Sequence, residues 1–301
     1  MANVTGKPDV ISNPEGTSLR GIIVFLSTLN IFLSITASLS NVMILIALRK
    51  VSSVHPPTKL FFRYLAVTDL CTGFIAQPLL AIHMLLPVIG VDWNTLIYIG
   101  RAENASGFIL CSVSILTSTA ISVDRLLALL LKMRYRHVVT LRRVRTVMTC
   151  FWLIGGSCGF LSFFGRFIAL YAAGSGLLIL FVVISVFAYT KIFFTLRQRQ
   201  AQVQAHGRQG QPNGVRIPLN IAKYKKTVSS IAWVQVALLV CYVPFAIVGL
   251  SAIYGRTTFF TWNCTATLLY LNSSLNPVLY CWKMKEVRQA VKDTVRQFYF
   301  V

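Results

Sequence analysis

Seven long apolar runs constrain this chain more than any other feature of its sequence. A helix that crosses a lipid bilayer needs about 20 mostly apolar residues, and inside the bilayer its backbone must satisfy its own hydrogen bonds. The runs are too long for barrel strands and lack their alternating pattern. The sequence therefore predicts an all-α membrane protein, a seven-transmembrane helix bundle. The predicted spans are Gly21–Leu48, Tyr64–Val91, Asn104–Leu131, Thr146–Gly165, Phe167–Thr190, Thr227–Gly255 and Thr257–Trp282.

Composition and charge agree with a membrane location. Of the 301 residues, 55% are hydrophobic and 12% are charged, whereas an ordinary soluble domain carries about 25% charged residues. The net charge of +21 would suit nucleic-acid binding, but its distribution argues against that partner. Since basic loops stay in the cytoplasm, an external N-terminus and a cytoplasmic C-terminus are predicted. Twenty-four of the 29 Lys and Arg residues lie in segments 49–63, 125–145, 191–226 and 283–301.

The sequence predicts three parts: an extracellular tail over residues 1–20, a transmembrane domain over 21–282 and a cytoplasmic segment over 283–301. The tail is polar, and no cleavable signal peptide is visible in it. Asn3 and Asn263 begin sequons predicted to lie outside, so both are candidate glycosylation sites.

Two segments on the basic side have distinct patterns. Gln198–Asn220 is rich in Gln, Gly, Arg and Pro without an apolar period, which predicts a mobile loop. The last segment predicts a basic amphipathic eighth helix lying on membrane lipid, with a calmodulin-binding helix as the alternative. Its apolar positions are Met284, Val287, Val291, Val295 and Phe298.

Polar residues inside membrane spans are costly and usually functional, and here they form an ordered set. With its motifs in this order on successive spans, the chain resembles the rhodopsin-like (class A) G-protein-coupled receptors from about Gly21 to Phe298. The resemblance implies a plasma-membrane receptor that passes an extracellular ligand's signal to a heterotrimeric G-protein. The residues that carry it are Asn41, Asp69, Asp124-Arg125-Leu126, Trp152, Tyr189, "CYVP" (Cys241–Pro244) and "NSSLNPVLY" (Asn272–Tyr280).

The resemblance implies a switch at the cytoplasmic ends of the spans. Arg125 would pair with Asp124 at rest and meet the G-protein when the sixth helix moves outward; an interfacial anchor is the alternative. Pro244 and Pro277 would kink their helices and act as hinges. The implied switch residues are Asp124, Arg125, Tyr189, Asn276, Pro277 and Tyr280.

Asp69 is the only acid in the middle of a span, and an isolated ionised carboxylate there would be very costly. Oxygen ligands suit a hard cation. By resemblance, an allosteric Na⁺ held by Asp69 and Ser114 would favour the inactive state. A protonated Asp69 in a neutral network is the alternative, and no other cofactor is expected. The pocket would be lined by Asn272, Ser273 and Asn276.

Several positions depart from the family pattern. Gly100 stands where the usual disulfide begins, Phe181 replaces a proline of the fifth helix, and Tyr242 replaces a tryptophan of the sixth. The missing disulfide, the very short connection between Gly165 and Phe167 and the proline-free fifth helix together look most like melanocortin receptors, and the end of the seventh span looks like adenosine receptors. At the start of the sixth helix the usual acid is absent, which predicts basal signalling. The residues there are Tyr224, Lys225 and Lys226.

The ligand is constrained mainly by exclusion. Gly107 stands where amine receptors carry an acid, which argues against a biogenic amine. Tyr270 stands where opsins carry the retinal-binding lysine, which argues against a photopigment. Glu103 is the best external charge for a cationic ligand. Peptide, nucleoside and lipid ligands all stay open. The other candidate pocket residues are His83, Cys111, Tyr242 and Phe245.

Two other classes of protein compete with a receptor. A seven-helix transporter or channel would need a polar path, and only one acid lies in mid-membrane. An intramembrane enzyme would need paired catalytic groups, but Asp69 and His83 lie about 21 Å apart along one helix. The sequence therefore predicts no enzyme.

Overall fold

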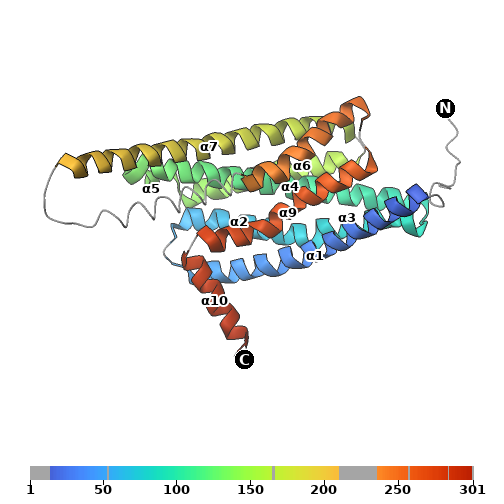
Figure 1. The fold of residues 1–301 in the computed structure, drawn as a ribbon, viewed down its shortest axis with the longest axis horizontal. Helices are drawn as coiled ribbons and strands as arrows, with labels where there is room; N and C mark the ends of the chain where they lie inside the picture. Colours follow the sequence, from blue (N-terminus) through green and yellow to red (C-terminus); the bar gives the residue numbers. More distant parts are fainter. Residues whose placement is uncertain are drawn as a thin grey trace.

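The computed structural model describes residues 14–52, 54–164, 167–209, 236–256, 258–283 and 285–299, and the regular elements within these ranges are all helical. The long helices form one bundle, with α10 projecting from the end away from the N-terminus (Figure 1). The elements are α1 (Pro14–Lys50), α2 (Pro56–Cys71), α3 (Gln77–Ile89), α4 (Trp93–Leu131), α5 (Tyr135–Val138), α6 (Leu141–Phe163), α7 (Phe167–Gln209), the helix Val236–Ser251, α9 (Phe259–Lys283) and α10 (Lys285–Tyr299).

The two ends of the bundle differ in the segments that they hold. The basic end holds the last turn of α1, with Arg49 and Lys50, and the start of α10. The opposite end holds the connection between α3 and α4. Here Gly90 adopts a left-handed conformation, φ 80°, that ends α3.

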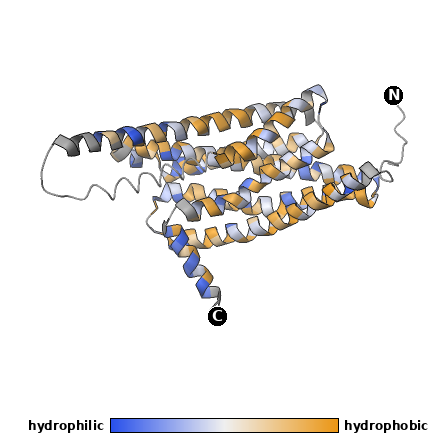
Figure 2. Ribbon diagram, in the orientation of Figure 1, coloured by the Kyte–Doolittle hydropathy of each residue, from blue (hydrophilic) through white to orange (hydrophobic). Residues whose placement is uncertain are grey.

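Most of the helices suit a membrane. Five stretches are long and apolar enough to cross one, and Val236–Ser251 is a shorter apolar helix. Large apolar side chains face outward, for example Phe25 and Phe160, each 65% exposed, and hydrophobic residues run along the helices of the bundle (Figure 2). The five stretches are Ser18–Lys50, Pro56–Ile89, Trp93–Leu131, Leu141–Phe163 and Ala173–Gln198.

The second span is interrupted by a π-helical turn, Thr72–Ala76, which joins α2 to α3. Pro78 follows it and cannot donate a backbone hydrogen bond. The Gln77 N–H bonds to the Thr72 carbonyl, and the Ser34 hydroxyl donates to the Gly73 carbonyl at 2.6 Å. This turn lies just beyond Asp69, and such π-bulges occur often at functional sites.

Small residues let α6 pack closely on α4. A Cβ added at Gly159 would lie 2.3 Å from Cγ1 of Ile109 and 2.9 Å from the carbonyl oxygen of Ala105. Gly155 likewise faces the Ile109 backbone. Close backbone approach through small residues is a general device of membrane helices.

The predicted mobile loop Gln198–Asn220 is wrong in its first half, because α7 continues as a helix to Gln209. Its Gln, Ala and Arg residues are strong helix formers, and they extend a helix that is already nucleated. The remainder, 210–220, lies outside the described residues.

The last segment forms α10, which turns away from the bundle (Figure 1). Val287 is fully buried, in one cluster with Ala47 and Leu48 of α1. The Lys50 ammonium donates to the Thr294 hydroxyl at 3.0 Å and to the Gln297 side-chain oxygen at 2.8 Å. These contacts fasten α10 to the end of α1.

Candidate functional site

Asp69 of α2 is fully buried and gathers the predicted polar cluster. One carboxylate oxygen accepts from the hydroxyls of Ser114 at 3.2 Å and Ser273 at 2.9 Å, and the other accepts from the Asn276 amide at 2.7 Å. The donors come from α4 and α9, so the contacts join three spans around one carboxylate. Asn41 of α1 donates to the Ser273 carbonyl at 3.0 Å and supports α9 from behind.

The chemistry of this cluster fits a small hard cation. Asp69, Ser114 and Ser273 bring carboxylate and hydroxyl oxygens together, which are the ligands such cations prefer. Asn272 adds a buried side-chain carbonyl oxygen without a hydrogen-bond partner among the described residues. An unsatisfied buried acceptor is costly, so it is an observation in favour of an ion or water at this point.

Tyr242 links this cluster to the larger cavity of the bundle. Its hydroxyl accepts from the Asn272 amide at 2.8 Å, and its ring lines the cavity described below. A tryptophan could not accept a hydrogen bond there. The replacement of the family's tryptophan by Tyr242 therefore creates a direct hydrogen bond between the helix Val236–Ser251 and α9.

At the basic end, the predicted resting ion pair between Asp124 and Arg125 does not form. The Asp124 carboxylate accepts instead from the Tyr135 hydroxyl at 2.6 Å and the Thr58 hydroxyl at 2.9 Å. Both partners are uncharged, and they come from α5 and α2. Burial, and then the bond to Asp124, raise the pKa of Tyr135 to about 12, so its hydroxyl stays protonated and remains a donor.

Arg125 has a different environment from the one predicted. Its guanidinium carbon lies 5.3 Å from the centre of the Phe62 ring, a cation–π arrangement. Its Nη2 atom is buried and has no hydrogen-bond partner in the described part of the chain. A buried donor without a partner can donate a hydrogen bond to a carbonyl or carboxylate of another molecule at little further cost in desolvation.

Three of the four remaining switch residues, Tyr189, Asn276 and Tyr280, line a small cavity of about 50 Å³. Tyr280 also packs edge-on against Phe62 at 4.9 Å. Both predicted hinges, Pro244 and Pro277, lie inside helices. The residues predicted for the sixth-helix start, Tyr224, Lys225 and Lys226, lie outside the described residues.

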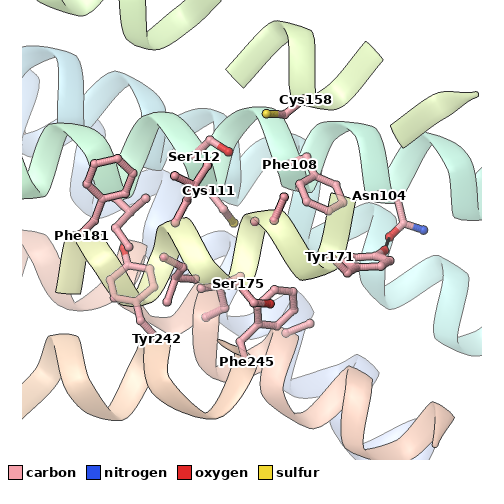
Figure 3. Close-up of a pocket in the computed structure, with 18 of the residues that line it drawn as sticks. Asn104, Phe108, Cys111, Ser112, Cys158, Tyr171, Ser175, Phe181, Tyr242 and Phe245 are labelled. Atoms are coloured by element: carbon pink, nitrogen blue, oxygen red, sulfur yellow. Dashed lines mark hydrogen bonds between the residues drawn. The ribbon is translucent and has the colours of Figure 1, made fainter. Parts of the chain in front are cut away.

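A second cavity, of about 140 Å³, lies towards the opposite end between α4, α6, α7, the helix Val236–Ser251 and α9. In Figure 3 it runs from Asn104 and Tyr171 to Phe181 and Tyr242. Six of the seven predicted ligand-pocket residues line it: Glu103, Gly107, Cys111, Tyr242, Phe245 and Tyr270. His83 is not among the lining residues, but its Nδ1 lies 3.9 Å from the Glu103 carboxylate.

Sequence reasoning missed the aromatic side chains at the end of this cavity that lies away from the basic end. Trp262 of α9 packs on Tyr171 at 4.3 Å and on Phe245 at 5.1 Å between ring centres, and Phe108 packs on Tyr171 at 5.0 Å. The Tyr171 hydroxyl donates to the Asn104 side chain. Only their helical register could have suggested these residues, because they belong to no motif.

A glycine at position 107 makes room for the neighbouring Tyr270 side chain, and no turn requires it. A Cβ at this position would lie 2.6 Å from the Tyr270 hydroxyl oxygen. The absence of a side chain therefore lets Tyr270 reach across the cavity. The acid that amine receptors carry at this position would collide with the Tyr270 hydroxyl in its present place.

The expected lack of the family disulfide and the candidate glycosylation site at Asn263 have different outcomes. All seven cysteines are free, as expected from the missing disulfide position, and a Cβ at Gly100 would face His83 at 3.0 Å. The structure argues against a glycan on Asn263, which is 2% exposed and whose amide donates to the Phe259 carbonyl at 2.7 Å. Asn3 lies outside the described residues.

Comparison with known proteins agrees with this geometry. The family described as "7 transmembrane receptor (rhodopsin family)" matches residues 40–169 and 162–280. Melanocortin receptor 4 of Danio rerio is 24% identical over 277 residues, which cover 87% of this chain and 81% of the relative. Adenosine receptor A3 of Ovis aries is 24% identical over 293 residues, covering 87% and 86%. Sphingosine 1-phosphate receptor 2 of Mus musculus is 28% identical over 279 residues, covering 83% and 71%.

These matches confirm the predicted fold class and the neighbourhood of melanocortin and adenosine receptors, and none favours a transporter or channel. Receptors of this family are multi-pass membrane proteins rather than enzymes. The chain belongs to the rhodopsin family of seven-transmembrane receptors and is a G-protein-coupled receptor.

Proposed function

We propose that this receptor works at the plasma membrane with its basic end in the cytoplasm. It responds to a small, mostly apolar ligand that carries one cationic group. The observation that carries the ligand proposal is the Glu103 carboxylate, which is 4% exposed in the wall of a cavity lined mainly by carbon atoms. A buried carboxylate favours a cation that can replace its lost hydration.

The cavity favours a small, mostly apolar ligand over two of the three classes left open by the sequence, peptides and nucleosides. Its volume of about 140 Å³ lies below the roughly 300–1,000 Å³ typical of drug-sized sites. The aromatic cluster of Phe108, Tyr171, Phe245 and Trp262 narrows the outer end, which disfavours a peptide. A nucleoside would need several polar contacts, but the Asn104 side-chain oxygen already accepts from Tyr171. The names of the relatives point to melanocortin, adenosine and sphingosine 1-phosphate, so they do not choose among these classes.

The signal passes from this cavity to the basic end through buried hydrogen bonds. A ligand that displaces the Tyr242 ring strains the Tyr242–Asn272 bond and so the seventh span beside Asp69. Na⁺ at Asp69, Ser114 and Ser273 favours the resting arrangement. Its loss lets α9 move, and Arg125 becomes available to the C-terminal segment of a heterotrimeric G-protein. Two packed arrangements separated by a few kcal/mol suffice for such a switch.

The experiment is a ligand screen read out as nucleotide exchange on a panel of G-proteins. The library contains amine-bearing apolar compounds, each paired with its uncharged N-acetyl analogue. The amines should be the more potent members, and Glu103→Gln should lower their potency about tenfold or more, since it removes one charge-assisted hydrogen bond.

Asp92→Asn is the matched control, because Asp92 is an exposed acid at the same end of the bundle and caps the Thr95 N–H at 2.9 Å. This variant should respond like the wild type. Equal potency of amines and N-acetyl analogues would refute the proposed ligand class. Loss of response in Asp92→Asn as well would point to long-range attraction by surface charge instead.

A further inference from the structure

A third cavity, of about 380 Å³, lies between α4, α6 and α7 on the basic side of Phe181. Its floor is formed by Ala120, Val123 and Leu127 of α4, and its walls include Val147 of α6 and Ile184 of α7. Both wall helices pack on α4 but touch each other little. A groove therefore forms on the outside of the bundle, within the membrane-spanning length of all three helices.

The groove is apolar, and its size differs from that of a packing defect. Its volume falls within the roughly 300–1,000 Å³ of ligand sites. Val147 is 38% exposed, so the wall faces the surrounding lipid rather than the interior. Leu116 and Phe181 line both this groove and the ligand cavity. The two spaces are neighbours separated by side chains from α4 and α7.

The mouth of the groove at the basic end carries arginines. Arg143 lines the groove, and its Nη1 donates to the Val138 carbonyl at 2.7 Å, which holds the exposed guanidinium beside α5. Asp124 also lines the groove, but its two oxygens already accept from Tyr135 and Thr58. Further exposed arginines lie at α5 and in the first turns of α6: Arg134, Arg136, Arg142 and Arg145.

We propose that this groove binds an anionic phospholipid, with one acyl chain between α6 and α7 and the phosphate at Arg143. The apolar length of the groove selects a membrane lipid over a soluble anion. The arginines, with Asp124 already satisfied by neutral donors, select a negatively charged head group over a zwitterionic one. The site itself does not depend on the proposed ligand cavity. Only its assignment to the cytoplasmic leaflet depends on the proposed orientation.

The test is native mass spectrometry of the full-length receptor in detergent, titrated with phosphatidylglycerol or with phosphatidylcholine of the same acyl chains. The wild type should retain one phosphatidylglycerol molecule more tightly than any phosphatidylcholine. R143Q should weaken that first binding step about tenfold, because it removes the charge at the groove mouth. R197Q is the control, since Arg197 is an exposed base on α7 that does not line the groove.

A second variant tests the groove without changing the charge. V147F places a larger side chain in the groove and should weaken the same binding step as strongly. L153F alters an exposed position of α6 that does not line the groove, and it should bind as the wild type does. Melting temperatures of all variants show which of them are folded. If R143Q does not fold, V147F still tests the groove.

The proposal is overturned by any of three results: unchanged binding in both R143Q and V147F, equal retention of the two lipids, or an equal loss in R197Q. The second result would mean ordinary lipid contact, and the third would mean attraction by general charge.

Discussion

Asp69 illustrates how much of this receptor depends on single side chains. It is fully buried and bonded to three residues from two other spans. An ionised carboxylate in such a place needs compensating charge as well as hydrogen bonds. The three uncharged donors do not supply that charge, which is why a cation is the proposed companion.

Replacement of Asp69 with Asn should abolish the sensitivity of agonist binding to sodium. The neutral amide removes the charge that attracts the ion, while its size preserves the packing. The measurement is agonist competition binding in sodium chloride against choline chloride at equal ionic strength. Sodium sensitivity that survives the change would contradict a cation at this site.

The Tyr135 hydroxyl, rather than an arginine, donates to the Asp124 carboxylate. Removal of this hydroxyl should destabilise the resting state. Tyr135→Phe leaves the carboxylate with Thr58 as its only observed donor, at a cost of about 1–3 kcal/mol. Basal nucleotide exchange should rise several-fold at equal surface expression. Tyr254→Phe, at an exposed tyrosine of the opposite end, should leave it unchanged. A basal rate in Tyr135→Phe equal to that of the wild type would show that this bond does not restrain the switch.

At the scale of elements, the pairing of α4 with α6 depends on glycine. Gly159 leaves no room for a side chain beside Ile109 and the Ala105 carbonyl, whereas Gly156, three residues earlier, has nothing within 4 Å of an added Cβ. A side chain at Gly159 would therefore meet α4, whereas one at Gly156 would meet no neighbour among the described residues. The two glycines form a matched pair for substitution.

Gly159→Val should destabilise the receptor by about 1–3 kcal/mol, because the two helices must separate to admit the side chain. The melting temperature of the purified protein should fall by several degrees. Gly156→Val, with the same loss of a glycine but no clash, should melt close to the wild type. Similar melting of the two variants would mean that close approach at Gly159 contributes little.

At the scale of the whole molecule, the distribution of basic residues sets the proposed orientation. The basic end receives the last turn of α1, the arginines of α6 and the whole of α10. Arg125 lies in the same half, in the last two turns of α4. An orientation with this end outside would place the switch residues where no G-protein exists.

An epitope tag at the N-terminus should therefore be stained on intact cells, and a tag at the C-terminus only after permeabilisation. The physical reason is that positively charged loops resist transfer across the membrane during insertion. Flow cytometry of both tagged receptors makes the comparison at equal total expression. Staining of the C-terminal tag on intact cells would reverse the proposed orientation.

Much of the site could be predicted because it depends on residue type at a given depth in a span. Asp69, Ser114, Ser273 and Asn276 meet as the resemblance to the family implied, and a buried acid needs such polar groups around it. Glu103 lines the larger cavity; it was predicted on a different ground, as the charge near the end of the third span best placed for a cationic ligand. The partners of Asp124 were not predicted, because Thr58 lies 66 residues away and neutral donors give no charge signal.

By itself the sequence determined the helical class, the seven spans and the one end that is rich in basic residues. Hydropathy and charge act on each segment separately, so they can be read without knowing its neighbours. Only the tertiary structure decided the length of α7, the aromatic cluster around Trp262 and the groove beside Arg143. These features depend on where helices cross and diverge, and that is set by close contacts such as those at Gly159.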